Sequence, residues 1–232
     1  MARGIGRIRG WFGKLALFLF ILLVPVPILL LLIFRFLPVP GTPEMLLSLV
    51  QGKGASYHWT GDISPRLERA VIAAEDQNFC THHGFDWASI NKAVTDHDRH
   101  PKKPMRGAST ISQQAARTLF LLPARSWIRK GMEAYLTVLM EALWPKKRIL
   151  QAYLNLVDWG DGIFGAEAAA NAYFETDAGS LDGAQAARLA AILPNPHKWK
   201  AAHPGRYVRR RTGMLVGRSA MVQRDGLNFC VR

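Results

Sequence analysis

The stretch that decides the fold class is SPRLERAVIAAED, residues 64–76. Ser64 followed by Pro65 makes a favourable helix start, because a serine hydroxyl caps free backbone N–H groups and proline suits the first turn. The apolar residues of the stretch recur on one helical face, and they are Leu67, Ala70, Val71 and Ala74. The stretch therefore predicts an amphipathic helix that ends near Glu75 and Asp76.

Helical patterns also dominate the rest of the chain. Thr110-x-x-Gln113 matches a capping box, which marks a helix N-terminus. A longer helix is expected from Ser126 to Trp144, and its expected buried stripe is Ile128, Met132, Tyr135, Leu136, Leu139 and Leu143. Further helices are expected at 147–157, 165–174 and 181–193, and the polar residues 96–106 are expected to form a loop. Because strand-like alternation is scarce, we predict an all-α domain.

An apolar run precedes this domain. Residues 15–34 contain no charge over 20 positions. A helix needs about this length to cross a hydrocarbon core of roughly 30 Å, so we predict one N-terminal transmembrane helix, kinked at Pro25 and Pro27. A cleaved signal peptide is the competing interpretation, but the run exceeds the usual apolar region of about 7 to 15 residues and no small-residue cleavage site follows.

The charges before this run predict its orientation. Arg3, Arg7, Arg9 and Lys14 precede it, and the positive-inside rule keeps such an N-terminus in the cytoplasm. We therefore expect a single-pass protein of the cytoplasmic (inner) membrane with a periplasmic domain. The expected parts are a cytoplasmic N-terminus at 1–14, the membrane helix at 15–34, a linker at 35–56 and one soluble domain at 57–232, with no room for a second catalytic domain.

The net charge of the chain is +13, which favours anionic partners. Nucleic acid, acidic lipid head groups and pyrophosphates all suit that charge. The expected placement outside the cytoplasm argues against nucleic acid.

The cysteines and adjacent histidines do not predict a metal site. Cys80 and Cys230 lack the close spacing of a zinc site and are too few for a disulfide scaffold, so we expect unpaired, half-buried thiols. His82 and His83 point in different directions because they are neighbours, and no spaced partner completes a ligand set.

Three groups of polar residues are candidates for chemistry. Glu75 and Asp76 stand at the unfavourable end of a helix dipole, which raises a carboxyl pKa and makes a better proton acceptor; a solvated helix end is the alternative. Ser109, Thr110, Gln113 and Gln114 lie at a helix N-terminus that suits phosphate or sugar hydroxyls, with Arg117 about two turns along; a plain helix cap is the alternative. The i,i+4 and i,i+3 spacings bring Arg129 and Lys130 beside Glu133, as in a surface ion pair.

Taken in order, five segments resemble the peptidoglycan glycosyltransferase family, and within it the monofunctional biosynthetic transglycosylase branch. They are Glu75-Asp76-x-x-Phe79-x-x-His82-x-Gly84, Gly107-x-Ser109-Thr110-Ile111-x-Gln113-Gln114, Arg129-Lys130-x-x-Glu133, Lys147-Arg148-Ile149-Leu150-x-x-Tyr153-Leu154-Asn155 and Ala190-Ala191-Ile192-Leu193-Pro194-Asn195-Pro196. The resemblance covers about residues 57–210, and five segments in sequence are highly specific. The residues after about Arg211 do not resemble the family closely and receive no role.

The resemblance implies a lysozyme-like helical fold with a cleft, and a reaction that polymerises lipid II into β-1,4-linked glycan. By analogy Glu75 is the general base, and Arg117, Arg129 and Lys130 neutralise the departing polyprenyl pyrophosphate. Glu133 is the second family carboxylate, which orients those cations, holds a divalent cation such as Mg²⁺ or Mn²⁺, or transfers a proton. The remaining implied substrate-binding or supporting residues are Asp76, Ser109, Thr110, Gln113, Gln114 and Asn155.

Several positions depart from the family pattern. Arg117 stands where lysine is usual, which keeps the attraction to pyrophosphate but changes the hydrogen-bond geometry. The other departures are Ser112, Asp158-Trp159 and Gln185.

Two other functions remain open at this stage. A lytic transglycosylase or lysozyme-like hydrolase shares the implied fold and lead glutamate, but its neutral sugar leaving group does not require the clustered cations. A non-enzymatic membrane-bound assembly factor would tolerate loss of Glu75. The expected partners are lipid II, the growing glycan, membrane lipids and cell-wall synthesis proteins, without transpeptidase activity or tightly bound cofactor.

Overall fold

The computed structural model describes residues 2–101, 107–124 and 126–232, without the side chains of residues 2–10, 12 and 16. It divides the chain into two compact units, Met1–Pro38 and Val39–Arg232. The second unit begins within the expected linker at 35–56. It does so because helix α3 (Pro43–Val50) buries Met45 and Ser48 in that unit.

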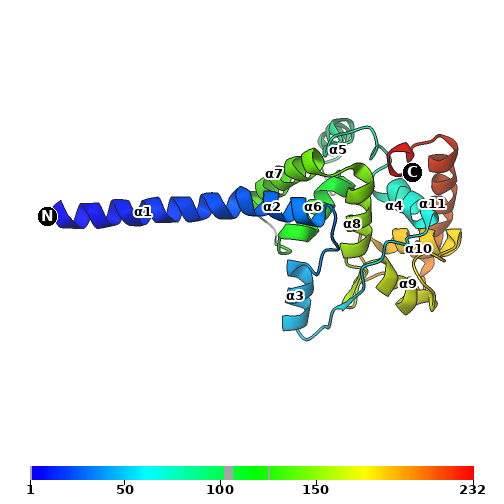
Figure 1. Ribbon diagram of the computed structural model, residues 1–232. Helices are drawn as coiled ribbons and strands as arrows, with labels where there is room; N and C mark the ends of the chain where they lie inside the picture. The colour runs from blue at the N-terminus through cyan, green and yellow to red at the C-terminus, as the bar shows by residue number, and fades with distance from the viewer. Residues whose placement is uncertain (1, 102–106, 125) are drawn as a thin grey trace. The chain divides into compact units, whose positions relative to one another are not determined.

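The first unit consists of α1 (Ala2–Leu23) and α2 (Pro25–Phe34), which Figure 1 shows in blue. Gly13–Phe34 is long and apolar enough to cross a membrane, with a mean hydropathy of 3.2. Val24 separates the two helices, next to the two prolines that lack backbone N–H donors. The expected interruption near Pro25 is therefore present, and the apolar helix agrees with a membrane anchor.

The second unit is helical, as predicted. Its elements are α3 (Pro43–Val50), β1 (Ser56–Tyr57), α4 (Pro65–Glu75), α5 (Trp87–Arg99), α6 (Ile111–Phe120), α7 (Trp127–Leu143), α8 (Lys146–Leu156), β2 (Ile163–Phe164), α9 (Ala166–Phe174), α10 (Gly183–Ile192), α11 (Arg206–Arg224) and the 3₁₀ helix η1 (Phe229–Val231). Within the described residues the two strands form one short parallel pair, with Ser56 opposite Ile163.

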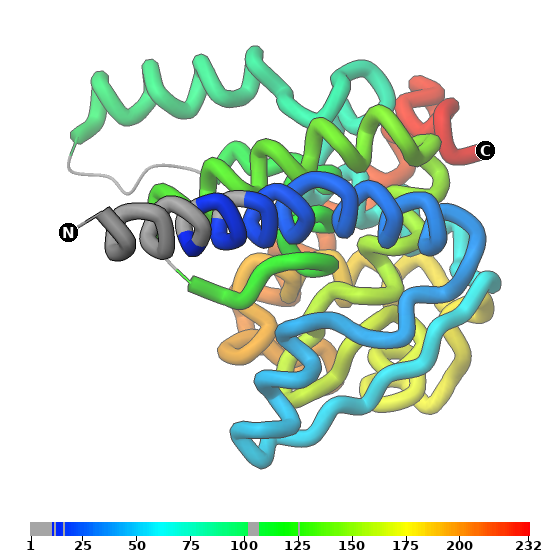
Figure 2. Tube along the Cα trace, turned by 60° about the vertical axis from the view of Figure 1, so that its left-hand side comes forward, coloured from blue at the N-terminus to red at the C-terminus, as the bar shows by residue number. Residues whose placement is uncertain are grey.

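Two groups of helices make up the core of this unit. One group is α4, α10 and α11, and the other is α6, α7 and α8. Figures 1 and 2 show α4 beside α11 in one group and α6 beside α8 in the other. α4 packs through the apolar face predicted from its sequence, because Leu67, Ala70 and Val71 are buried. Between the groups, the end of α4 meets α6, where Glu75 and Asp76 contact Gln114 and Ile111.

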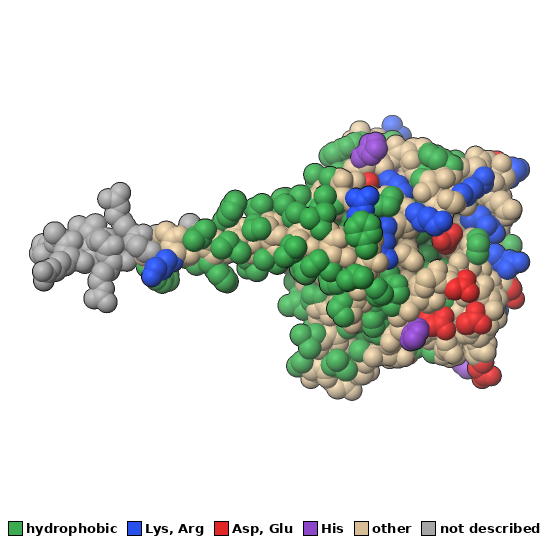
Figure 3. Space-filling view, viewed as in Figure 1, with side chains coloured by type: hydrophobic (Ala, Val, Ile, Leu, Met, Phe, Trp, Pro, Cys, Tyr) green, Lys and Arg blue, Asp and Glu red, His purple; other side chains and the backbone are tan. Residues whose placement is uncertain are grey.

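Helix α3 leaves much of its apolar surface exposed. Thr42 caps it by accepting a hydrogen bond from Met45 N at 3.2 Å. Leu46, Leu49 and Val50 remain exposed. Figure 3 shows hydrophobic side chains gathered on this part of the second unit. An exposed apolar group of this kind suits a lipid or protein surface.

Glycine at position 165 is required by close packing. Gly165 has a φ of +84°, and a Cβ there would lie 2.4 Å from the carbonyl oxygen of Asn155. No L side chain fits that approach without moving the backbone. Gly165 therefore lets α9 begin directly against α8.

The structure changes two expectations about helices. α5 continues to Arg99, so the expected loop at 96–106 begins later, while residues 102–106 lie outside the described residues. Ile128, expected in the buried stripe of α7, is 83% exposed. The buried residues of α7 are instead Glu133, Leu136, Thr137 and Met140. The apolar pattern predicted the wrong face here because two polar residues, Glu133 and Thr137, lie on the buried face.

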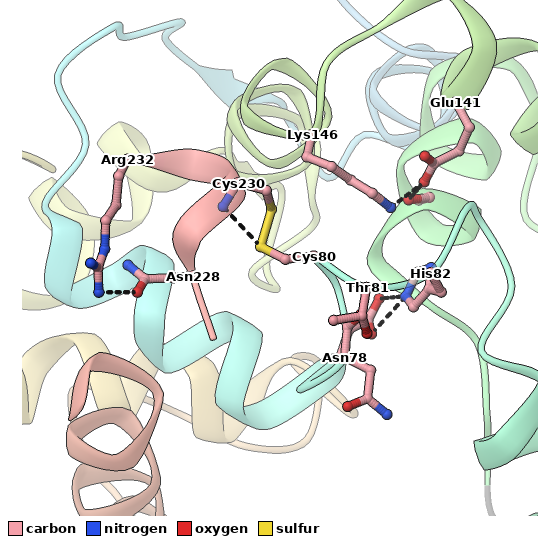
Figure 4. Close-up of a disulfide and its surroundings, with 11 residues drawn as sticks. Asn78, Cys80, Thr81, His82, Glu141, Lys146, Asn228, Cys230 and Arg232 are labelled. Carbon is pink, nitrogen blue, oxygen red and sulfur yellow. Dashed lines mark hydrogen bonds and ion pairs between the residues drawn. A yellow bond between two sulfur atoms is a disulfide. The ribbon is translucent and has the colours of Figure 1, made fainter. Parts of the chain in front are cut away.

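The expectation of unpaired cysteines is wrong. Cys80 and Cys230 form a disulfide with a Cα–Cα distance of 5.4 Å, and Figure 4 shows it between η1 and the segment after α4. The two residues are 150 positions apart, so sequence spacing carries no sign of the pairing. The expected half-burial of both residues is confirmed.

Replacing Gly165 with alanine is expected to lower the free energy of unfolding by about 2–4 kcal/mol, from backbone strain and the clash with Asn155 O. Denaturant unfolding of the detergent-solubilised full chain would measure it. Gly217→Ala is the control, because Gly217 is a helical glycine with open space around it. That variant is expected to be neutral or to stabilise by up to about 1 kcal/mol. Equal effects of the two changes would contradict the packing argument.

Candidate active site

Glu75 lies at the last residue of α4, where it meets the second helix group. Gln114 Nε2 donates a hydrogen bond to Glu75 Oε2 at 3.1 Å, and an Arg211 guanidinium nitrogen lies 4.0 Å from Oε1. Burial raises the pKa of Glu75 above its ordinary value of 4.5, although Gln114, Arg211 and Arg117 oppose the rise. A carboxylate with a raised pKa is suited to accept a proton near neutral pH.

Asp76 is buried and joins α4 to α6. Its Oδ2 accepts a hydrogen bond from Ile111 N at 2.9 Å, at the N-terminus of α6. His82 Nε2 lies 3.0 Å from both carboxylate oxygens. These contacts favour a positioning role for Asp76, because they engage both oxygens that were expected to bind substrate.

Thr110 and Gln113 form the capping box predicted from the sequence. Thr110 N donates to Gln113 Oε1 at 3.0 Å, and Gln113 N donates to Thr110 Oγ1 at 3.2 Å. Thr110 Oγ1 also donates to the carbonyl of Gly84 at 2.6 Å. Gly84 has a φ of +87°, and a Cβ there would lie 2.9 Å from Thr137. The cap therefore fixes the start of α6 against the segment that follows Glu75.

The predicted group of Arg129, Lys130 and Glu133 is assembled on α7. Arg129 Nη1 donates to Glu133 Oε2 at 2.9 Å, and Lys130 Nζ donates to Oε1. The side chain of Glu133 is 3% exposed and that of Lys130 is 42% exposed. Lys130 Nζ also lies 3.4 Å from Ser109 Oγ. The carboxylate thus lies behind the cations, which keep their outer surfaces open to a ligand.

Two cavities contain the predicted site residues. One, of about 280 Å³, is lined by Glu75, Asp76, Ser109 and Thr110 together with residues of α5 and Arg218. The other, of about 460 Å³, is lined by Glu44, Arg117, Leu121, Pro123, Ala124 and Arg129. Gln114 and Arg117 lie three residues apart on α6, so this helix runs from the carboxylate at one cavity to the cations at the other.

Three site residues were missed by the sequence analysis. Tyr153 donates to Gln114 Oε1 at 3.1 Å, and burial raises its pKa well above the ordinary value. Glu44, in the expected linker, lines the second cavity, and burial raises its pKa too. Arg211 comes from the C-terminal stretch that had received no role. Tyr153 stood in a quoted motif, but Glu44 and Arg211 carried no local signal.

Asn155 supports the wall of the site. Its Oδ1 accepts from Thr60 N at 2.8 Å, and its Nδ2 donates to the carbonyls of Thr60 and Gln151 at 3.0 and 2.9 Å. It is fully buried. These bonds tie α8 to the segment that leads into α4, which agrees with the expected supporting role.

The described residues do not form a metal cage by themselves. In residues 2–101, 107–124 and 126–232, no three His, Cys, Asp or Glu side chains cluster as a metal site would require. Both carboxylate oxygens of Glu133 are engaged by cations. A divalent cation bound to Glu133 would therefore share these oxygens with Arg129 and Lys130.

Replacing Asn155 with leucine is expected to lower the free energy of unfolding by about 2–4 kcal/mol, because the N–H and C=O of Thr60 would lose their partner. Chemical denaturation of the full chain would measure the change. Asn171→Ala removes an exposed asparagine and is the matched control, expected within about 0.5 kcal/mol of wild type. A large loss of catalysis without a loss of stability would instead indicate that Asn155 contacts substrate.

Comparison with known proteins found one matching family model and several relatives. The transglycosylase family model matches residues 44–219. Three relatives are each described as a biosynthetic peptidoglycan transglycosylase. The one from Caulobacter vibrioides is 50% identical over 200 residues, covering 85% of this chain and 86% of the relative. The one from Rhodospirillum centenum is 49% identical over 201 residues, with 85% and 86% covered, and that from Pseudomonas aeruginosa is 46% identical over 206 residues, with 85% and 87% covered.

The matched range includes Glu75, Glu133 and the cations Arg117, Arg129 and Lys130. It also includes Glu44 and Arg211, which lie outside the quoted motifs. The chain belongs to the transglycosylase family.

Proposed function

We propose that the protein is a peptidoglycan glycosyltransferase, which polymerises lipid II into β-1,4-linked glycan for the bacterial cell wall and releases polyprenyl pyrophosphate. Membership of the transglycosylase family supports the reaction class. The observation that carries the proposal is the arrangement of a half-buried carboxylate, Glu75, at the end of α4 and a group of half-buried cations on α6 and α7. Proton acceptance and anion departure are the two tasks that this transfer requires.

Glu75 acts as the general base in this mechanism. It takes the proton from the 4-hydroxyl of the acceptor sugar as that oxygen attacks C1 of the growing chain. The attack inverts the configuration, so an α-linked donor becomes a β-linked product without a covalent enzyme intermediate. Gln114 holds the reacting carboxylate in place, and Tyr153 in turn holds the amide of Gln114.

Arg117, Arg129 and Lys130 act on the leaving group. The departing pyrophosphate gains negative charge as the bond to C1 breaks, and fixed cations stabilise that charge by several kcal/mol. Buried Glu133 orients Arg129 and Lys130 toward the ligand. We expect any divalent cation in the reaction to be held by the pyrophosphate, because Mg²⁺ commonly binds protein sites through substrate phosphates.

The substrate accounts for the membrane anchor. Lipid II is confined to a membrane, and the helical stretch Gly13–Phe34 would confine the enzyme to the same plane. The exposed apolar residues of α3 give the soluble unit a surface that suits lipid. The Cys80–Cys230 disulfide is typical of an oxidising compartment, which supports a periplasmic domain with a cytoplasmic N-terminus.

The variant Glu75→Gln is expected to lose at least about 100-fold in polymerisation rate, because an amide cannot accept the proton. Labelled lipid II, incubated with the full chain in detergent, would give a glycan ladder on a gel with wild type only. Glu175→Gln makes the same change at an exposed carboxylate and should keep the ladder. Degradation of added glycan would favour a hydrolase, and equal behaviour of both variants would favour an assembly factor.

The rate of polymerisation is expected to fall at acidic pH through a pKa above 4.5, because burial raises the pKa of Glu75. The base works only when deprotonated, so activity is present above that raised pKa and is lost as the pH falls through it. Initial rates measured across pH would locate this acidic limb. An acidic limb at or below the ordinary glutamate pKa would contradict the assignment of Glu75 as the buried base.

A further inference from the structure

The Cys80–Cys230 disulfide joins the segment that follows Glu75 to the segment that follows α11. Cys80 follows Glu75 by five residues, and Cys230 follows Arg211 by nineteen. α4 and α11, which carry Glu75 and Arg211, pack against each other. Glu75 and Arg211 approach to 4.0 Å in this packing, and the disulfide joins the chain segments that follow the two helices.

The C-terminal side of this connection is the short helix η1 and the residues around it. η1 is three residues long and packs on α8, with Val231 buried. Cys230 N donates to Cys80 Sγ at 3.3 Å, and Arg232 donates to Asn228 Oδ1 at 3.1 Å. Phe229, the largest side chain of η1, is 60% exposed. The disulfide therefore adds a covalent restraint to these contacts at the end of the chain.

The other side of the connection belongs to the active site. Cys80 stands between Phe79, which is buried, and His82, which contacts Asp76. Lys146 Nζ lies over the ring of Phe79, 4.6 Å from its centre, and forms an ion pair with Glu141 at 2.6 Å. Figure 4 shows Cys80, His82 and this ion pair close together. Motion of Cys80 would therefore disturb the segment that fixes Asp76 and, through it, Glu75.

We propose that the Cys80–Cys230 disulfide is a positioning element for the transfer reaction, and that the oxidised protein is the fully active form. By joining the segment after α4 to the segment after α11, the bond restrains the α4–α11 packing that places Arg211 beside Glu75. This inference rests on the proposed function, because it concerns the geometry of its general base.

The proposal has an electrostatic consequence. The charged or titratable groups that face Glu75 are Asp76, Arg117 on α6, Tyr153 on α8 and Arg211 on α11. Arg211 lowers the pKa of Glu75, and it is the cation whose helix leads to the disulfide. If the disulfide is broken and Arg211 drifts away, the pKa of Glu75 rises. The acidic limb of the activity then moves to higher pH.

Formation of the bond needs an external oxidant. The two thiols lose two protons and two electrons, and a disulfide of the oxidant takes them up and becomes two thiols. A dithiol–disulfide oxidoreductase of an oxidising compartment, or a small disulfide such as oxidised glutathione, supplies this chemistry. Both cysteines are half-buried, so small reagents reach them from solvent.

The test compares redox forms of the full chain in detergent. Wild type is assayed with labelled lipid II when oxidised, after reduction with dithiothreitol, and after reoxidation with oxidised glutathione. The variant Cys80→Ser with Cys230→Ser serves as the form without a bond, and Phe229→Ser perturbs η1 while leaving the bond intact. For each form kcat, KM and the pH profile of kcat are measured at a temperature where circular dichroism finds the protein folded.

Reduction is expected to lower kcat by about threefold or more with little change in KM, and to move the acidic limb to higher pH. Reoxidation should restore kcat and the pH profile. The double variant should match reduced wild type and should not respond to dithiothreitol. Phe229→Ser should match oxidised wild type. An unchanged kcat and pH profile on reduction, or a loss of thermal stability alone, would overturn the inference and leave the proposed function standing. If oxidised wild type makes no glycan, the proposed function fails and the inference fails with it.

Discussion

The carboxylate of Asp76 is the contact on which the rest of the site depends. It is buried at the end of α4, accepts a hydrogen bond from Ile111 N at the start of α6, and contacts His82. A buried carboxylate is costly unless such partners satisfy it, and a helix N-terminus is a favourable partner for negative charge. This one contact sets α4 against α6. It therefore sets Glu75 against Gln114, three residues farther along α6.

Glu133, like Asp76, is a buried carboxylate whose charge is compensated by its partners. Glu133 is nearly inaccessible to solvent, but Arg129 and Lys130 each bind one of its oxygens. Removing either partner would leave a buried charge under-compensated, so the three residues behave as one unit. The result is a rigid cationic surface whose outer N–H donors remain available. An anion-releasing reaction needs that surface, whereas the departure of a neutral sugar would not.

The C-terminal region joins the site in a way that no linear motif records. α11 packs on α4 and brings Arg211 to Glu75, and η1 is tied to Cys80 by the disulfide. The first contact is made by Glu75 at the end of α4, and the second by Cys80, which lies just after this helix. The last part of the chain thus contributes to the charge and the position of Glu75, although its own sequence resembles an ordinary basic helix.

The sequence by itself determined the apolar membrane-length helix, the helical class, the bounds of α4 and the start of α6, because hydrophobic period, caps and prolines act locally. It also determined the group on α7 and the capping box, whose members lie three or four residues apart on one helix. Only the tertiary structure decided that Asp76 is a buried connector, that Glu44 lines a cavity, that Arg211 approaches Glu75, and that Cys80 pairs with Cys230. The physical reason is distance along the chain. These contacts join residues that are far apart in the sequence, where no helical or strand periodicity relates them. Only the packing of α3, α4, α6 and α11 brings them together.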